Sequence, residues 1–263
     1  MLTIRNYVQA ESLEEAYTLN QKRNARVLGG MLWLKMSDGT AGTVIDLCRL
    51  GLDSIEETEE QFSIGAMATL RPFELHPGLH AYTRGMAAWA VRDIVGVQFR
   101  NMATMGGSVW GRFGFSDVLT FLLSMDTYVE LYKGGIIPLE TFAEMKRDND
   151  ILVRILIRKT PGDFVYLAMR NQRTDFPILT CALSRMENEY RAVIGHHLRV
   201  AGGVAKVPLF GQLRHRRGPV LHAAQLRVRE VGVEVVAGGL PRPDMLKAGL
   251  QQEEVAVLQI IFQ

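Results

Sequence analysis

The stretch that decides the fold runs from Gln98 to Asp117 and reads QFRNMATMGGSVWGRFGFSD. In it the hydroxyl residue Thr104 precedes the glycine pair Gly106-Gly107, and Ser108 follows at once. Paired glycines let the backbone approach a ligand closely, and their N–H groups can converge on an anion. A flanking hydroxyl suits phosphate oxygens, and the acid Asp117 suits ribose hydroxyls. Because a bare glycine pair more often marks a tight turn, the pair alone does not decide between these interpretations.

The wider stretch resembles the second flavin loop of the FAD subunit of molybdenum hydroxylases, the family of xanthine dehydrogenase and carbon monoxide dehydrogenase. That family writes roughly Q-x-R-N-x-A-T-x-G-G-N and, after a short gap, Ser/Ala-Asp. The residues that match in register are Gln98, Arg100, Asn101, Ala103, Thr104, Gly106, Gly107 and Asp117. Ser108 stands where the family usually has Asn. The resemblance extends over about residues 1–190.

A second glycine pair, Gly29-Gly30, lies where the family carries its first flavin loop. A strand that runs into glycines and then a helical turn presents free N–H groups to a pyrophosphate. Met31 replaces the family's hydroxyl residue, and Leu32 replaces its polar neighbour. One phosphate contact is therefore lost, or the backbone alone supplies it.

The resemblance implies a set of flavin-binding residues but no catalytic side chain. In the family, an Ile-Leu pair at the start of a strand lies against the isoalloxazine ring, and here that pair is Ile151-Leu152. The family's Lys near the ring is absent, since Tyr166 takes its place, and Arg170 is left to pair with Asp175 or to contact flavin. The cofactor-binding residues expected for FAD are Arg26, Leu28, Gly29, Gly30, Met31, Leu32, Trp33, Thr104, Gly107, Ser108, Trp110, Asp117, Ile151 and Leu152.

The composition is that of an ordinary globular protein, and it argues against several classes of function. The chain of 263 residues is 48% hydrophobic, and its net charge of +2 does not favour nucleic acid as a partner. Cys48 and Cys181 are the only cysteines, which excludes a four-cysteine metal or iron–sulfur site and predicts a cytoplasmic protein. The same count excludes a subunit of the benzoyl-CoA-reductase type, because that type carries an extra iron–sulfur cluster. We expect no signal peptide and no membrane span, because the N-terminus and the remaining chain lack suitable apolar runs.

The resemblance implies an α+β protein with a vanillyl-alcohol-oxidase-like FAD-binding fold in two subdomains and a small C-terminal α+β domain. The expected limits are 1–55 and 56–160 for the two subdomains, with FAD between them, and 161–263 for the C-terminal domain. Beyond Gly195 the resemblance fades, and the family's terminal R-x-S-x-x-Y-R pattern is missing. Either a diverged, shortened branch or a changed reading frame would account for that ending.

The patterns of apolar and turn-forming residues predict the individual elements. We expect Ser12 to cap a helix that ends near Asn20, a polar turn at 52–60 and a hairpin turn at 133–135. Further helices are expected at 76–91, 118–124 and 139–143, and strands at 3–9, 26–28, 42–47, 62–70, 125–131 and 151–158.

The resemblance also implies a role in electron transfer within a complex. In the family, a molybdenum-cofactor subunit oxidises the substrate, and a subunit with 2Fe–2S clusters carries the electrons. The FAD subunit then passes the electrons to NAD or another acceptor. Two alternatives stay open: a structural subunit that has lost flavin, and a stand-alone flavin oxidoreductase of the vanillyl-alcohol-oxidase type. The second needs a covalent flavin link or a large substrate domain, and the chain is too short for that domain.

Overall fold

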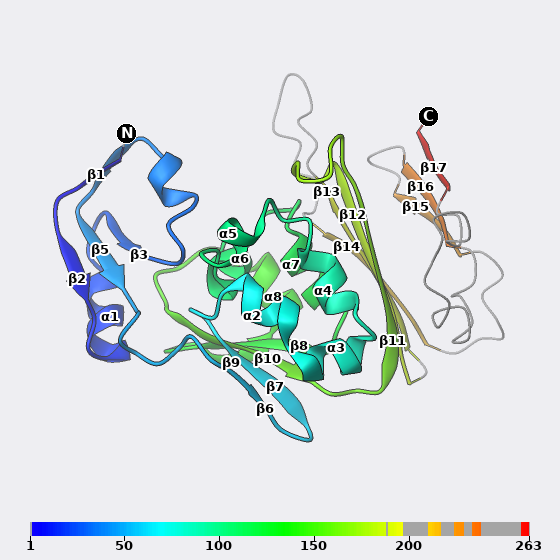
Figure 1. Cartoon of the computed structure of the whole chain (residues 1–263), viewed down its shortest axis with the longest axis horizontal. Coiled ribbons are helices and arrows are strands. Elements are labelled where there is room, and N and C mark those ends of the chain that lie inside the picture. Colours follow the sequence, from blue (N-terminus) through cyan, green and yellow to red (C-terminus); the bar gives the residue numbers. More distant parts are fainter. Residues whose placement is uncertain are drawn as a thin grey trace.

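The computed structural model describes residues 2–187, 189–196, 210–216, 224–228, 233–237 and 259–262. Figure 1 shows small N-terminal sheets at one end, a group of short helices beside a larger sheet in the middle, and a long-stranded sheet beyond them. The expected C-terminal ending after Gly195 lies mostly outside the described residues.

The N-terminal part is a three-stranded parallel sheet covered by helix α1 (Leu13–Asn20). Ser12 caps α1 as predicted, because its Oγ accepts a hydrogen bond from the N–H of Glu15. The predicted strand at 3–9 is split, and its first half pairs in a separate two-stranded sheet. In sheet order, the three-stranded sheet consists of β2 (Tyr7–Gln9), β5 (Thr43–Asp46) and β3 (Ala25–Val27). The two-stranded sheet consists of β1 (Leu2–Ile4) and β4 (Gly39–Ala41).

The central part contains a five-stranded antiparallel sheet. In sheet order, its strands are β6 (Ile55–Glu57), β7 (Gln61–Gly65), β10 (Leu152–Arg158), β8 (Thr127–Leu131) and β9 (Gly135–Pro138). The prediction of a polar turn over all of 52–60 was wrong, because β6 forms within it. The turn is confined to the end of that segment, where the Thr58 hydroxyl accepts the N–H groups of Glu60 and Gln61. The turn predicted at 133–135 joins β8 to β9.

Short helices pack on this sheet and fill the middle of the molecule. They are α2 (Leu70–Leu75), α3 (Pro77–Thr83), α4 (Met86–Val91), α5 (Val97–Arg100), α6 (Met105–Trp110), α7 (Asp117–Leu123) and α8 (Leu139–Glu144). The single helix predicted at 76–91 is two helices. Arg84 and Gly85 both adopt left-handed backbone, with φ of 51° and 84°, so the chain turns between α3 and α4.

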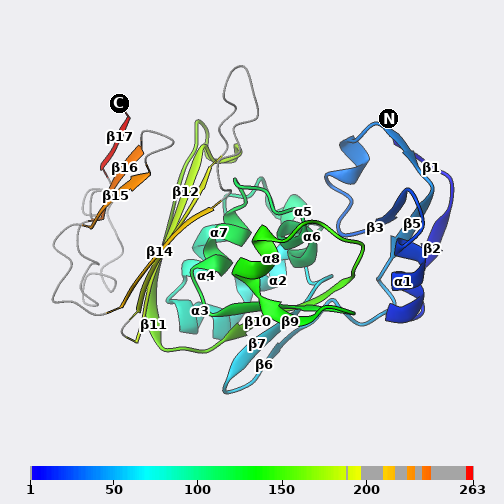
Figure 2. The ribbon, with the colours of Figure 1, turned by 180° about the vertical axis from the view of Figure 1, so that it is seen from behind.

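A second antiparallel sheet lies on the other side of these helices, as Figure 2 shows from behind. Its strands, in order, are β11 (Gly162–Met169), β12 (Leu179–Met186), β13 (Glu189–His196) and β14 (Phe210–Arg216). Helix α4 packs on β11, and α7 packs on β12 and β13. One hydrophobic core therefore runs from Phe62 of β7 through Phe121 of α7 to Val193 of β13. Three more strands pair among themselves: β15 (Ala224–Val228), β16 (Val233–Ala237) and β17 (Gln259–Phe262).

Candidate functional site

The first glycine loop presents a run of backbone N–H groups that have no acceptor within the described part of the chain. Strand β3 ends at Val27, and the N–H of Leu28 still donates to the carbonyl of Ile45 at 2.8 Å. The N–H groups of residues 29–34 donate to no other described residue. Met31 has left-handed backbone, with φ of 60°, at the bend of this loop. Successive free N–H groups around such a bend are the donor arrangement that binds phosphate oxygens.

The two glycine loops lie against each other, and glycine is needed at both positions of the first pair. A Cβ added to Gly29 would lie 2.6 Å from Thr104 Oγ1 and 3.6 Å from Gly107 Cα. A Cβ added to Gly30 would lie 1.8 Å from the carbonyl oxygen of Met102. Side chains at 29 and 30 would therefore force the loops apart. The structure thus brings together the two loops that the sequence assigned to one dinucleotide.

The second glycine loop uses its own N–H groups to hold helix α6 in place. Thr104 caps this helix, because its Oγ1 accepts the N–H of Gly107 at 3.1 Å. The N–H of Gly106 donates to the carbonyl of Ala66 at 2.9 Å, and a Cβ on Gly106 would lie 2.5 Å from that oxygen. Gly106 therefore serves close packing, whereas the exposed Gly107 faces the first loop. The free backbone donors come from the first loop.

Asp117 begins helix α7 and is buried at the edge of this region. Its carboxylate accepts hydrogen bonds from the Tyr166 hydroxyl and the Arg170 guanidinium. Burial raises the pKa of the Asp117 carboxyl above its ordinary value, while the neighbouring Arg170 charge opposes that rise. Burial also raises the pKa of Tyr166 well above its usual range, so this hydroxyl stays protonated and donates. Any bond from Asp117 to a ribose would use the remaining lone pairs of an already engaged carboxylate.

Arg170 forms its ion pair with Asp117, and not with Asp175 as considered from the sequence. Its side chain donates to the backbone carbonyl of Asp175 at 2.7 Å, and its ion pair is with Asp117 instead. Tyr166, which stands at the family's Lys position, reaches the same carboxylate from β11. The three side chains therefore join α7 to the β11–β12 loop.

Four aromatic rings from three separate segments meet beside the first glycine loop. Trp33 lies 5.4 Å from Phe113 and 5.4 Å from Phe176, centroid to centroid, and its ring is stacked on Phe176 at 24°. Phe115 completes the group at 5.3 Å from Phe113 and 5.2 Å from Phe176. We call Trp33, Phe113, Phe115 and Phe176 the aromatic cluster. Sequence reasoning named only Trp33, although the FGF run in the second loop carries the signal for two of the others.

Several other expected cofactor-binding residues pack in the core or make contacts within the chain. Leu28 is buried against Val44, and Arg26 donates to the carbonyl of its neighbour Ala25. Ile151 and Leu152 are 1% and 6% exposed, and they pack in two different hydrophobic clusters. Trp110 and Ser108 belong to helix α6, where Trp110 packs on Phe142 and the Ser108 hydroxyl donates to the Thr104 carbonyl. Leu32 packs against the central core.

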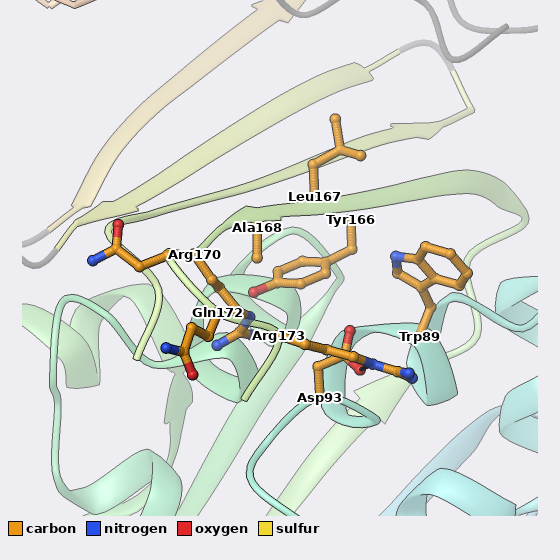
Figure 3. Close-up of a pocket in the computed structure, with 9 residues that line it drawn as sticks. Trp89, Asp93, Tyr166, Leu167, Ala168, Arg170, Gln172 and Arg173 are labelled. Carbon is orange, nitrogen blue, oxygen red and sulfur yellow. Dashed lines mark hydrogen bonds and ion pairs between the residues drawn. The ribbon is translucent and has the colours of Figure 1, made fainter. Parts of the chain in front are cut away.

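A cavity of about 320 Å³ opens on the face formed by α4 and the end of β11. In Figure 3, Trp89 and Arg170 lie on opposite sides of the Tyr166 ring. Arg173 closes one edge through a 2.7 Å ion pair with Asp93. Of the residues expected to bind cofactor, none lines this cavity. It shares only Tyr166 and Arg170 with the contacts around Asp117.

Within the ranges that the structure describes, no group of three or more His, Cys, Asp or Glu could hold a metal ion. No helix in those ranges is long and apolar enough to cross a bilayer.

Residues 2–159 match the family model described as the FAD binding domain in molybdopterin dehydrogenase. The chain belongs to this family. FAD is therefore its cofactor. The first glycine loop fits the diphosphate of FAD, since its N–H groups are free and its glycines allow the second loop to close against it. Met31 lacks the side-chain hydroxyl that the family carries here, but the backbone N–H donors of this FAD-binding domain are still present.

Solved structures of known proteins share the fold of this FAD-binding family member. A carbon monoxide dehydrogenase from Hydrogenophaga pseudoflava, which lacks the Mo-pyranopterin moiety of the molybdenum cofactor, is 20% identical over 72% of this chain and 74% of that chain, with a TM-score of 0.63. Quinoline 2-oxidoreductase from Pseudomonas putida 86 is 17% identical over 72% and 73%, with a TM-score of 0.63. Reconstituted CO dehydrogenase from Oligotropha carboxidovorans is 19% identical over 73% and 74%, with a TM-score of 0.63. A comparison with curated protein sequences gave no match.

Proposed function

We propose that the chain is the FAD-binding, electron-transfer subunit of a molybdenum-dependent hydroxylase or dehydrogenase. In this proposal it accepts electrons from 2Fe–2S clusters of a partner subunit and delivers them to NAD or another acceptor. A separate molybdenum-cofactor subunit would oxidise the substrate, as in xanthine dehydrogenase. FAD, when bound, supplies the redox chemistry, and the protein supplies binding, orientation and electrostatics.

The observation that carries the proposal is the row of free N–H groups at residues 29–34. Residues 29–34 are half-buried or exposed, so water can reach these donors in the unliganded chain and a bound ligand can replace it. Here the donors lie in one loop, at its contact with a second glycine loop. A diphosphate would satisfy several of them together, and its charge would suit the donors' partial positive charges.

The division into domains stays part of the proposal. The parallel sheet of β2, β5 and β3 falls within 1–55, and the five-stranded sheet begins at Ile55 and ends at Arg158. Strands β11 to β14 follow from Gly162. These separate sheets support two FAD-binding subdomains of vanillyl-alcohol-oxidase type at 1–55 and 56–160 and a third domain at 161–263. The scarcity of cysteine supports a cytoplasmic location.

One structural feature favours a second candidate function, that of a structural subunit that does not retain flavin. Tyr166 and Arg170 both donate to Asp117 Oδ1, so one oxygen of an expected cofactor ligand is already engaged within the chain. The two candidates differ in whether the purified chain holds FAD.

The test is the flavin content and electron transfer of the native complex, purified through a tag on this chain. We expect stoichiometric FAD on release by heat, co-purifying molybdenum and iron, and bleaching of the flavin absorbance when the substrate of the complex is added. A complex that contains molybdenum and iron but no FAD would support the structural subunit. A chain that purifies with FAD but without metal-containing partners would favour a stand-alone flavoprotein.

A further inference from the structure

We propose that the aromatic cluster of Trp33, Phe113, Phe115 and Phe176 is a stacking site for one flat heteroaromatic ring of the bound dinucleotide. This inference rests on the proposed function, because it adds a ring-binding site to the proposed diphosphate site. Family membership identifies FAD but assigns no role to the three phenylalanines. The two candidate rings are the adenine and the isoalloxazine, and both present a flat π-face to an aromatic side chain.

The first argument is the position of Trp33 in the chain. It lies within the run of free N–H groups at residues 29–34, so one backbone segment carries both the anion donors and the indole. Both rings of FAD are linked to its diphosphate through a sugar or sugar-like chain. A ring attached to a diphosphate in this loop can therefore reach the cluster. The four aromatic side chains of the cluster come from three segments of the chain.

The second argument is exposure. Trp33 is 48% exposed and Phe176 is 54% exposed, although each is stacked on the other. Large aromatic side chains gathered at a surface, beside unpaired polar groups, are typical of ligand sites rather than of a core. Trp and Phe stack on flat rings at little conformational cost, because each has only two side-chain torsions.

The third argument is that the segment leading into Phe176 is held at two points. Arg170 is tied to the Asp117 carboxylate, and Arg173 is tied to Asp93 at 2.7 Å. Across the turn that directly precedes Phe176, the N–H of Gln172 donates to Asp175 Oδ2 at 3.1 Å, which makes this turn compact. Asp117 is therefore a positioning residue for the cluster, acting through Arg170.

Phe113 is held in a comparable way on the opposite loop. A Cβ added to Gly111 would lie 2.7 Å from Phe113 Cε2, so the ring lies directly over this glycine. The next residue, Arg112, adopts left-handed backbone with φ of 46°, and its Nη1 donates to the carbonyl of Met145 at 2.7 Å. The cluster is thus built on fastened loops, which is what a preorganised stacking surface requires.

The experiment is isothermal titration of the full chain, freed of flavin, with FAD, FMN and ADP. We compare Trp33→Ala, Trp33→Phe and Phe176→Ala with wild type, and use Trp89→Ala as the matched control. Trp89 is also half-exposed but lies on α4, where it is stacked under Arg92. The expected result is that Trp33→Ala and Phe176→Ala each weaken FAD binding about ten-fold or more, that Trp33→Phe recovers most of the affinity, and that Trp89→Ala has no effect.

The shorter ligands identify the ring. FMN lacks the AMP half of FAD, and ADP lacks the isoalloxazine and its ribityl chain. A loss of FMN affinity in the variants, with unchanged ADP affinity, therefore assigns the stack to isoalloxazine. The reverse pattern assigns it to adenine. Wild-type FAD affinity in both Trp33→Ala and Phe176→Ala, with unchanged circular dichroism, would overturn the stacking site and leave the proposed function standing. A wild-type chain that binds none of the three ligands would overturn the proposed function itself.

Discussion

The Tyr166 hydroxyl donates a hydrogen bond to the Asp117 carboxylate, and this contact joins strand β11 to helix α7. The two residues are 49 positions apart in the chain. Arg170 completes the arrangement from the loop that follows β11. The contact therefore couples the packing of the second sheet to the region where FAD is expected to bind.

Tyr166→Phe should destabilise the folded chain by about 1–3 kcal/mol, because a buried carboxylate loses one of its two side-chain donors. The measurement is urea unfolding followed by circular dichroism. Tyr128→Phe is the matched control, since its hydroxyl makes only a long contact of 3.4 Å with exposed Arg158. Equal unfolding midpoints for the two variants would show that the Tyr166 bond carries little stability.

Gly107→Val should abolish FAD binding. A Cβ at this position would lie 2.9 Å from Thr104 Oγ1, so a branched side chain would displace the hydroxyl that caps α6 and lies against Gly29 of the first loop. The readout is FAD retained after gel filtration, measured by absorbance. Gly96→Ala is the control, because its added Cβ would meet only Gln98 Oε1, at 3.5 Å. Stoichiometric FAD in a folded Gly107→Val variant would remove this position from the site.

Gly30→Ala tests the contact between the two glycine loops. The added methyl group would overlap the Met102 carbonyl, so we expect the loops to separate and the free energy of unfolding to fall by about 1–3 kcal/mol. FAD affinity should fall as well, because the donors of residues 29–34 would move. Both quantities can be measured on one preparation, by urea unfolding and by titration. A variant with native stability and native affinity would mean that the loops do not touch in solution.

The two cysteines should differ sharply in reactivity. Cys48 is exposed, whereas Cys181 is buried and burial raises its pKa to about 12. A thiol reagent such as DTNB at pH 8 should therefore modify one thiol of the native chain and two after denaturation. Cys48→Ser should abolish the native reaction, and Cys181→Ala should leave it unchanged. Rapid native reaction of Cys181 would show that strand β12 is not covered by α7.

Tyr82 should make the fold sensitive to alkaline pH. Burial raises its pKa from 10.0 to about 12, and its hydroxyl donates to the carbonyl of Thr160 at 2.8 Å. Between those two values the unfolded chain releases the proton more readily than the folded chain. Stability is therefore complete below pH 10 and declines as the pH rises toward 12. Urea unfolding at pH 8, 10 and 11 should show a smaller decline for Tyr82→Phe than for wild type, and identical declines would contradict the assignment.

Local patterns in the sequence predicted the features that depend on neighbouring residues. The Ser12 cap, the turn at 133–135 and the two glycine pairs each follow from residue types at fixed short spacings. The register of the second glycine motif also indicated the FAD-binding family, which the match over residues 2–159 confirmed. Strand β6 was missed because its pairing with β7, rather than its own polar composition, decides its conformation.

The sequence by itself therefore determined which family the chain belongs to, which cofactor it binds, and where its flexible glycines lie. Tertiary structure alone decided which groups meet. It joined Asp117 to Tyr166 and Arg170, gathered the aromatic cluster from three segments, and buried Ile151 and Leu152 in the core. The physical reason is that these contacts join residues far apart in the chain. Local propensities act over a few neighbouring residues, so only the packing of sheets and helices brings such segments together.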